Sequence, residues 1–340
     1  MDKETQICIV GPGAIGGVVA GVLSREGYQI QLVVKYPELA EKISNSGIEV
    51  TGAKGNFTIR VPSVASPSQL KGTFDYVLIA TKAYGLADAA REMLPFLHEN
   101  SRVVSMQNGI CGEMLAEIVG ELRTIGCVVG FGGTMLEPGR VEMTSGGELV
   151  IGNWNRGPDH QLDELAMILS HVVETRVTGE IFQELYSKMI INSCITTLGV
   201  ISGQSLGEML VKRKARNIFI EIIREALAVA GAMDIKVPPG AAGKLDYYTF
   251  LAHGPFSGLK RHLTIRVIGM KYRKLKSSSL QSLKRGRKTE VYNYNGYISA
   301  KGKELGVATP VNEQLTRTVG EIEQGTRKIG PENFREFTMN

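Results

Sequence analysis

The sequence has no long apolar run. No stretch approaches the roughly 20 consecutive apolar residues that a membrane-spanning helix needs. The first residues, Met1–Thr5, are polar and lack the basic start, apolar stretch and small-residue cleavage site of a secretory signal peptide. We therefore expect a cytoplasmic protein with no membrane partner.

Cysteine and histidine are scarce. The chain has four cysteines and five histidines, with no Cys-x-x-Cys pair and no histidine at metal-ligand spacing. Cys8, Cys111, Cys127 and Cys194 stand in apolar or glycine-containing surroundings, where a free thiol packs like a small hydrophobic side chain. We expect reduced, mostly buried cysteines and no metal site.

The net charge is only +5, but positive charge gathers in one stretch. The cations of this stretch are Lys260, Arg261, Arg266, Lys271, Arg273, Lys274, Lys276, Lys284, Arg285, Arg287 and Lys288. They form either a solvated basic surface or a local field that attracts an anionic ligand. No nucleic-acid-binding module accompanies them, so we expect no nucleic-acid partner.

The length and composition fit a folded protein of two domains. The chain has 340 residues, of which 43% are hydrophobic and 21% charged, far from the composition of disordered chains. So many residues are distributed more readily over two cores than one. We place the boundary between a first domain, 1–178, and a second, 179–340.

A glycine-rich turn follows the first predicted strand. Gln6–Val10 is an apolar run of strand length, and Gly11-Pro12-Gly13-Ala14-Ile15-Gly16 follows it directly, at the start of a predicted helix that Gly27 ends. Gly11 suits the tight turn, Gly13 lets the backbone approach a pyrophosphate, and Gly16 permits close helix packing. The helix N-terminus, at Ala14, Ile15 and Gly16, offers free amides to the anion. In this setting the pattern predicts dinucleotide binding rather than a coincidental glycine-rich turn.

The second predicted strand, Gln29–Val34, is followed by a cation. NAD-binding domains usually place a carboxylate there, on the ribose 2′-hydroxyl. Here the residue is Lys35, and an ammonium group favours the 2′-phosphate that a carboxylate would repel. The expected cofactor is therefore NADP(H).

Further strands predict a parallel sheet. Asp75–Ala80 and Arg102–Met106 are apolar runs separated by helical segments, and Gly130–Gly133, 149–152 and a helix near 160–173 follow. Ligands bind such sheets at the carboxyl ends of the strands, where Lys82 could contact cofactor phosphate and Asn108 the nicotinamide ribose or the substrate. The alternatives are a surface lysine and an Asn-Gly turn. The first domain is thus predicted to be α/β, a doubly wound sheet of Rossmann type.

The second half is predicted to be all-α. Amphipathic helices are expected over 180–200, 206–231 and 280–306, whereas 240–276 is expected to be partly helical with loops. The apolar helices are compatible with a homodimer.

The helix over 180–200 carries a polar stripe. Lys188, Asn192 and Thr196 follow at intervals of four, so they share one face among apolar neighbours. Burial disfavours a lysine's charge and lowers its pKa toward the range useful in acid–base chemistry. An ammonium group could stabilise the oxyanion that forms when hydride adds to a ketone and then protonate it. The alternative is an amphipathic lysine reaching solvent from a packed helix.

With these features the chain resembles the ketopantoate reductase family, within the 6-phosphogluconate dehydrogenase-like reductases. The resemblance spans nearly the whole length. It rests on the glycine turn, Lys35, Thr81-Lys82-Ala83, Gln107-Asn108-Gly109, Lys188 with Asn192, Ser277-Ser278-Ser279-Leu280-Gln281, Gly286-Arg287-Lys288-Thr289-Glu290 and Asn295-Gly296.

The resemblance implies roles for several residues. Lys188 would be the general acid, and Glu290 its acidic partner and a cofactor contact. Asn108, Asn192 and Thr196 would line the substrate, and Ser278 would donate to its carboxylate. From the residues alone, Ser278 could equally be a plain helix cap. Glu290 is expected on the same helix, where it could equally form a surface ion pair with Arg287.

Three departures concern the substrate. Family members usually carry Asn at Thr196, Asp at Ser282 and Asp at Tyr292. Ketopantoate is the first substrate expected, and a different or more acidic 2-oxo acid is the alternative. Two further readings keep the fold: a dehydrogenase of a related hydroxy or amino acid, and a cofactor-sensing protein without catalysis.

Overall fold

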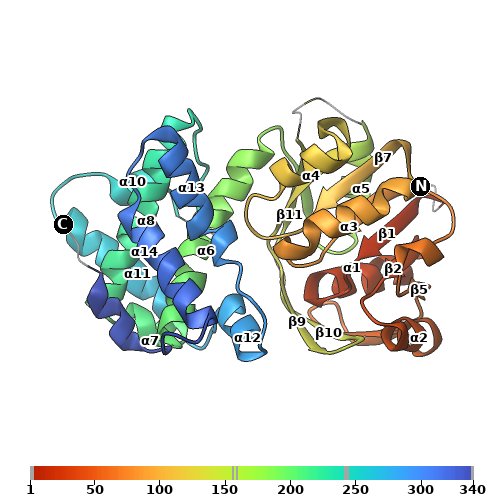
Figure 1. Cartoon of the computed structure of the whole chain (residues 1–340), viewed down its shortest axis with the longest axis horizontal. Helices are drawn as coiled ribbons and strands as arrows, with labels where there is room; N and C mark the ends of the chain where they lie inside the picture. Colours follow the sequence, from red (N-terminus) through yellow and green to blue (C-terminus); the bar gives the residue numbers. More distant parts are fainter. Residues whose placement is uncertain (1–3, 155–156, 158–159, 241–244, 338–340) are drawn as a thin grey trace. The chain divides into compact units, whose positions relative to one another are not determined.

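The computed structural model describes residues 4–154, 157, 160–240 and 245–337. The chain divides into two compact units, Met1–Leu185 and Tyr186–Asn340 (Figure 1). The boundary between the two units falls inside helix α6 (Ile181–Ser202). The boundary predicted from the sequence lies between residues 178 and 179. The chain start at 1–3 and residues 241–244 of the loosely assigned segment lie outside the described residues. Among the described helices, none is long and apolar enough to cross a membrane.

The first unit is an α/β domain. Its main sheet has eight strands in the order β12-β11-β8-β7-β6-β1-β2-β5, and β11 runs antiparallel to β8 while the pairs from β8 to β5 are parallel. Its elements are β1 (Gln6–Val10), α1 (Ala14–Arg25), β2 (Gln29–Val33), α2 (Pro37–Ser46), β3 (Ile48–Gly52), β4 (Phe57–Ile59), β5 (Ser63–Val64), β6 (Phe74–Ile79), α3 (Leu86–Met93), β7 (Leu97–Ser105), α4 (Gly112–Val119), β8 (Thr124–Val129), β9 (Gly132–Glu137), β10 (Arg140–Ser145), β11 (Leu149–Asn153), α5 (His160–Ser170) and β12 (Thr175–Val177).

Strand β1 shows why helices cover both faces of this sheet. Successive side chains of a strand point to opposite faces. Ile7 and Ile9 join the core that includes α1 and α5, whereas Cys8 and Val10 join the core of α3 and α4. The predicted doubly wound Rossmann sheet is confirmed. All four cysteines are free and buried, as expected, and burial raises the pKa of the Cys8 and Cys194 thiols.

The first unit also contains a second sheet, which the sequence patterns did not predict. It has the order β4-β3-β10-β9 and packs against α1, where a Cβ on Gly21 would lie 2.4 Å from Val50 Cγ2. The strand predicted over Gly130–Gly133 is wrong, because β8 ends at Val129 and Gly132 begins β9 in this other sheet. Its strands are short, and β3 pairs with β10, about 90 residues away, so local patterns carried little signal.

The second unit is built from helices, which confirms the predicted all-α class. With α6 they are α7 (Leu206–Leu210), α8 (Arg213–Ala232), α10 (Tyr247–Leu251), α11 (Ser257–Lys271), α12 (Ser278–Lys284), α13 (Asn295–Leu305) and α14 (Pro310–Glu323).

Two predicted helices of this unit are interrupted. The expected helix 206–231 is α7 and α8, separated at Val211 and Lys212. The expected helix 280–306 is wrong as well. Gly286 adopts φ +68° and its amide bonds the carbonyl of Leu283, which closes α12, and α13 begins only at Asn295. Glu290 therefore does not lie on the helix of Ser278.

A buried carboxylate caps α14. Glu225, on α8, is 8% exposed, and its carboxylate accepts hydrogen bonds from the amides of Val311 (2.8 Å) and Asn312 (2.9 Å) and from Asn312 Nδ2 (2.6 Å). Burial raises the pKa of Glu225, and these donors partly offset the rise. Asn295 Nδ2 donates to Asn312 Oδ1, and Thr197 on α6 donates to Asn295 Oδ1. A buried polar chain thus joins α8, α14, α13 and α6.

Glu225→Gln is expected to destabilise the protein. The amide of glutamine places a donor where the helix also presents donors, which costs about 2–4 kcal/mol of the free energy of unfolding. Glu304→Gln is the control, since Glu304 is exposed on α13 and pairs with Lys301 at the surface. Urea unfolding measures both variants, and equal midpoints would contradict the capping role.

Candidate active site

The glycine turn of the first unit has the predicted geometry. Gly11 adopts φ +87°, and a Cβ there would lie 2.9 Å from Thr81 Cγ2. A Cβ on Gly16 would lie 2.6 Å from the carbonyl oxygen of Gly11, so the helix packs directly on the turn. Gly13 has no protein atom within 4 Å of its Cβ position. The turn is thus tight on the protein side and open beside Gly13.

The start of α1 offers amide donors at this open side. Gly17 N makes the first i to i−4 bond, to Gly13 O, so the amides of Ala14, Ile15 and Gly16 precede the helical ladder. No side chain caps this end. Such an end binds an anion such as a pyrophosphate.

Thr81 adds a polar group to this cradle. It follows β6 directly and lies against Gly11, and its Oγ1 is buried with no hydrogen-bond partner. The side chain of Gln107 ties the strand ends together, because Nε2 donates to the carbonyls of Ile79 (2.8 Å) and Thr81 (3.1 Å). The open Gly13 and the orphaned hydroxyl fit a bound dinucleotide. The sequence motif that contains Thr81 predicts no role for its side chain.

The other predicted cofactor residues lie at the carboxyl ends of the strands. Lys35 is exposed two residues after β2, with Nζ 5.2 Å from the centroid of the Tyr36 ring. Lys82 and Asn108 are half-buried and follow β6 and β7. These ends lie on the side of the sheet where ligands of open α/β domains bind.

The polar stripe of the second unit lies on α6. Lys188 and Asn192 are half-buried, and Thr196 is buried one turn further on. Their spacing of four places them on one face of the helix. Lys188 is therefore neither fully buried nor fully exposed.

Hydrogen bonds hold α6 next to Lys188. Tyr247, fully buried, donates from Oη to the carbonyl of Ser187 at 2.6 Å, and Ser187 Oγ donates to the carbonyl of Pro238 at 2.9 Å. Tyr186 Oη donates to the carbonyl of Ala226 at 2.8 Å. These bonds fasten the turn that carries Lys188 to α8 and to the segment that follows it.

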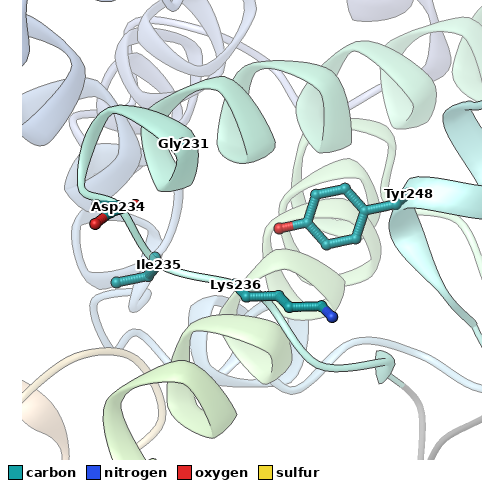
Figure 2. Close-up of a pocket in the computed structure, with 5 residues that line it drawn as sticks. All are labelled: Gly231, Asp234, Ile235, Lys236 and Tyr248. Atoms are coloured by element: carbon teal, nitrogen blue, oxygen red, sulfur yellow. The ribbon is translucent and has the colours of Figure 1, made fainter.

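The same segment forms an open pocket of about 360 Å³ (Figure 2). Its lining residues are Gly231, Asp234, Ile235, Lys236 and Tyr248. Tyr248 and Lys236 come from two separate segments, and Tyr248 Oη accepts a hydrogen bond from Val237 N at 3.1 Å. None of the predicted site residues lines this pocket, so it adds nothing to the candidate active site.

Glu290 is buried, so the alternative of a surface ion pair is wrong. It is 3% exposed, whereas Arg287 is exposed. Tyr294 Oη donates to Glu290 Oε2 at 3.4 Å. Glu290 immediately precedes a 3₁₀ turn, Val291–Asn293, that leads into α13. The first residue of α13, Asn295, accepts a hydrogen bond from Thr197 of α6. The polar chain through Asn295 therefore fixes the segment of Glu290 against α6.

The serine triplet begins α12. Ser277 is the cap residue, and its Oγ accepts from Leu280 N at 3.2 Å, so Ser278 is not a plain cap. Ser278 is exposed and Ser279 is buried with no partner for its Oγ. A Cβ on Gly199 of α6 would lie 2.7 Å from Ser277 Oγ. The start of α12 therefore lies against α6, one turn from Thr196.

Both halves of the chain match one protein family. Residues 7–156 match Ketopantoate reductase PanE/ApbA, and residues 180–323 match Ketopantoate reductase PanE/ApbA C terminal. The chain belongs to the ketopantoate reductase family. This membership confirms the resemblance inferred from the glycine turn, Lys188 and the C-terminal motifs, and it makes the chain an oxidoreductase.

Individual similar proteins are distant in sequence but match along nearly their whole length. A 2-dehydropantoate 2-reductase of Aquifex aeolicus is 28% identical over 92% of this chain and 94% of its own. The crystal structure of a PanE/ApbA family ketopantoate reductase from Ralstonia eutropha has a TM-score of 0.81 at 26% identity, over 95% of this chain and 100% of the other. A D-mandelate dehydrogenase in ternary complex with NADH and anilino(oxo)acetate has a TM-score of 0.81 at 22% identity, over 94% and 99%. This last likeness concerns the fold alone.

Proposed function

We propose that this member of the ketopantoate reductase family is an NADPH-dependent reductase of a 2-oxo acid, with ketopantoate (2-dehydropantoate) as the first substrate to test. The single observation that carries the proposal is the polar face of α6, with Lys188, Asn192 and Thr196 in successive turns of the helix. A role in pantothenate synthesis and a cytoplasmic location belong to the same proposal.

The first unit would hold the cofactor. The amides of Ala14, Ile15 and Gly16 would bind the pyrophosphate beside Gly13, and Lys35 the 2′-phosphate. Lys82 would neutralise phosphate charge, Asn108 would contact the nicotinamide ribose or the substrate, and Glu290 would also contact the cofactor. When bound, NADPH supplies the hydride.

Lys188 would act on the ketone oxygen. As hydride adds to the carbonyl carbon, negative charge grows on the oxygen, and an ammonium group stabilises it and then transfers a proton to form the hydroxyl. Glu290 would help to hold Lys188 in its charged form, because a buried carboxylate favours a nearby cation. Ser278 and Asn192 would orient the substrate by hydrogen bonds to its polar groups.

Fewer residues bear on the identity of the 2-oxo acid than on the reductase activity itself. Thr196 offers a hydroxyl where family members usually carry an amide, and Ser282 and Tyr292 replace carboxylates. The same fold serves a D-mandelate dehydrogenase, so the fold is compatible with more than one substrate. The cations between Lys260 and Lys276 favour a different or more acidic 2-oxo acid as the second candidate.

Steady-state oxidation of NADPH with a panel of 2-oxo acids tests the proposal. We expect ketopantoate to give the highest kcat/KM. Faster turnover of a dicarboxylic or bulkier 2-oxo acid would support the reductase activity but reject ketopantoate as the substrate. Preferential oxidation of a hydroxy or amino acid by NADP would favour a dehydrogenase. Tight NADPH binding without turnover of any of these compounds would favour a cofactor-sensing protein.

Lys35→Glu is expected to change the cofactor preference. A carboxylate at this position repels the 2′-phosphate and can accept from a ribose hydroxyl, so kcat/KM for NADPH should fall about 10- to 100-fold while that for NADH is kept or rises. Lys71→Glu is the control, because Lys71 is an exposed lysine of the same unit. An unchanged preference in Lys35→Glu would remove Lys35 from the cofactor site.

A further inference from the structure

Arg216 is a buried cation without a carboxylate partner. It lies at the start of α8 and is 9% exposed. Its Nη1 donates to the carbonyls of Leu210 (2.8 Å) and Val211 (2.6 Å), and its Nε donates to His262 Nδ1 at 3.1 Å. Among the described residues, no carboxylate oxygen lies within 4.0 Å of the guanidinium. Only neutral groups therefore meet this charge, although a buried charge is costly without a counterion.

Part of the Arg216 side chain has a structural role. The two carbonyls that Nη1 contacts belong to the end of α7, where a cation satisfies the last acceptors and interacts favourably with the helix dipole. This role occupies Nη1 and Nε. The remaining amino group, Nη2, has no hydrogen-bond partner in the part of the chain that the structure describes. The cap explains why an arginine stands here, but it leaves one edge of the guanidinium unused.

Two further arginines surround this edge. Arg213 precedes Arg216 by one turn of α8, and Arg266 follows His262 by one turn of α11, so each shares a helix face with a residue of the Arg216–His262 bond. Burial, followed by Arg266 and Arg213, lowers the pKa of Arg216. Both exposed arginines thus lie close enough to repel the buried one. We call Arg213, Arg216 and Arg266 the arginine cluster.

His262 adds a neutral donor to the arginine cluster. Burial, followed by Arg216, Arg213 and Arg261, lowers the pKa of His262, so the ring is uncharged at neutral pH. Because Nδ1 accepts from Arg216, the single ring proton is on Nε2, which can donate to a ligand. Arg261 is not available in the same way, since it donates to three carbonyls at the end of α10.

The surrounding chain supplies no negative charge to the arginine cluster. Residues 209–220 and 247–289 contain no aspartate or glutamate. Glu208, just before the first of these segments, accepts hydrogen bonds from N and Oγ of Ser205 at 2.8 Å, and these bonds lower the pKa of its carboxyl group. Its carboxylate is thus engaged at the other end of α7. The three positive charges remain without a counterion among the described residues.

We propose that the arginine cluster binds a phosphate group with two negative charges, either free or as part of a small metabolite. Guanidinium groups match the geometry of phosphate oxygens, and such charge-assisted hydrogen bonds are stronger than neutral ones. Nη2 of Arg216 and Nε2 of His262 would be the donors held in place by the fold. Arg213 and Arg266 would supply further charge, which a phosphate dianion offsets better than a single carboxylate does.

The phosphate site is separate from the proposed reductase chemistry. Tyr186, which precedes Lys188 on α6, bonds the carbonyl of Ala226, and Ala226 lies about 15 Å further along α8 than Arg216. The proposed pyrophosphate site, at the turn of Gly13, belongs to the first unit. Binding of phosphate by the arginine cluster therefore neither requires nor replaces the proposed function.

Isothermal titration calorimetry of the full chain with inorganic phosphate, at neutral pH and low ionic strength, tests the proposal. We expect a dissociation constant below about 1 mM, which Arg213→Gln and Arg266→Gln should each raise at least about 10-fold. Arg335→Gln is the matched control, because Arg335 is an exposed arginine of the same unit. Gly13→Val should keep the binding. No binding by the wild-type chain up to about 10 mM, or binding lost in Gly13→Val and kept in Arg266→Gln, would overturn the proposal.

Thermal unfolding distinguishes a binding site from a chance gathering of cations. In NaCl without phosphate, Arg266→Gln should raise the midpoint of unfolding by about 2 °C, because it removes a repulsion. In phosphate of the same ionic strength the order should reverse, since bound phosphate stabilises only the wild-type chain. If Arg266→Gln stays the more stable protein in phosphate, the proposal is wrong.

Two probes distinguish the sources of the phosphate group. Glycerol phosphate should compete with inorganic phosphate for the wild-type chain, and the chain should not sediment with vesicles that contain phosphatidic acid. Sedimentation with these vesicles that Arg266→Gln abolishes would support the same site and assign it to a lipid headgroup. Failure of both glycerol phosphate and the vesicles to displace inorganic phosphate would overturn the assignment to a phosphate ester.

Discussion

Lys188→Ala is expected to lower kcat by about 10²- to 10⁴-fold and to leave the dissociation constant of NADPH nearly unchanged. The reason is that the proposed role of Lys188 is confined to the ketone oxygen, whereas the proposed phosphate-binding groups lie in the first unit. Single-turnover oxidation of NADPH with ketopantoate gives the rate, and fluorescence titration gives the cofactor affinity.

A second substitution at this position separates charge from proton transfer. Lys188→Arg keeps the positive charge, but a guanidinium does not release its proton in a protein. We expect it to recover only part of the loss. Lys303→Ala is the control, because Lys303 is an exposed lysine on α13. Normal turnover in Lys188→Ala would refute the proposed mechanism. Circular dichroism of the variant shows whether a lost activity comes from the missing amine or from a loss of folding.

Gly13→Val is expected to raise the dissociation constant of NADPH at least about 100-fold, a change of roughly 2.7 kcal/mol, with little loss of stability. A Cβ on Gly13 meets no protein atom within 4 Å, and its φ of −74° lies outside the left-handed region that favours glycine, so the folded chain leaves room for a Cβ there. The added methyl groups would occupy the space that the pyrophosphate is proposed to enter.

Matched glycines show whether this effect is specific. Gly146→Val is the control, since Gly146 also has open space at its Cβ position but lies away from the turn in the sequence. Gly16→Ala should lower stability as well as affinity, because its Cβ would lie 2.6 Å from the carbonyl oxygen of Gly11. Tight NADPH binding by Gly13→Val would exclude the glycine turn as the pyrophosphate site.

Local sequence patterns were sufficient to predict the elements of the cofactor domain. The predicted first strand, Gln6–Val10, matches β1 residue for residue, and α1 ends at Arg25, before Gly27 with φ +89°. These features are encoded within a few residues of one another, in an apolar run, a glycine that permits positive φ and a helical repeat. The same holds for the stripe on α6, since Lys188, Asn192 and Thr196 share a face whenever the segment is helical.

Long-range packing limited what could be predicted elsewhere. Glu290 stands in an exposed, basic stretch of sequence and is nevertheless buried beside Tyr294. Glu225 caps a helix that starts 85 residues later, and no pattern around either element indicates that bond. The break between α12 and α13 had a local signal at Gly286, which the apolar periodicity on both sides outweighed.

The sequence by itself determined the fold class, the family and the candidate chemistry. The glycine turn and the strand ends each consist of adjacent residues, and the polar stripe of α6 follows from one helical repeat. Only the tertiary structure decided which polar groups are buried and which apolar groups are not. Burial depends on the elements that pack against a residue, and these come from distant parts of the chain. The burial of Glu225 and of Glu290 depends on such packing.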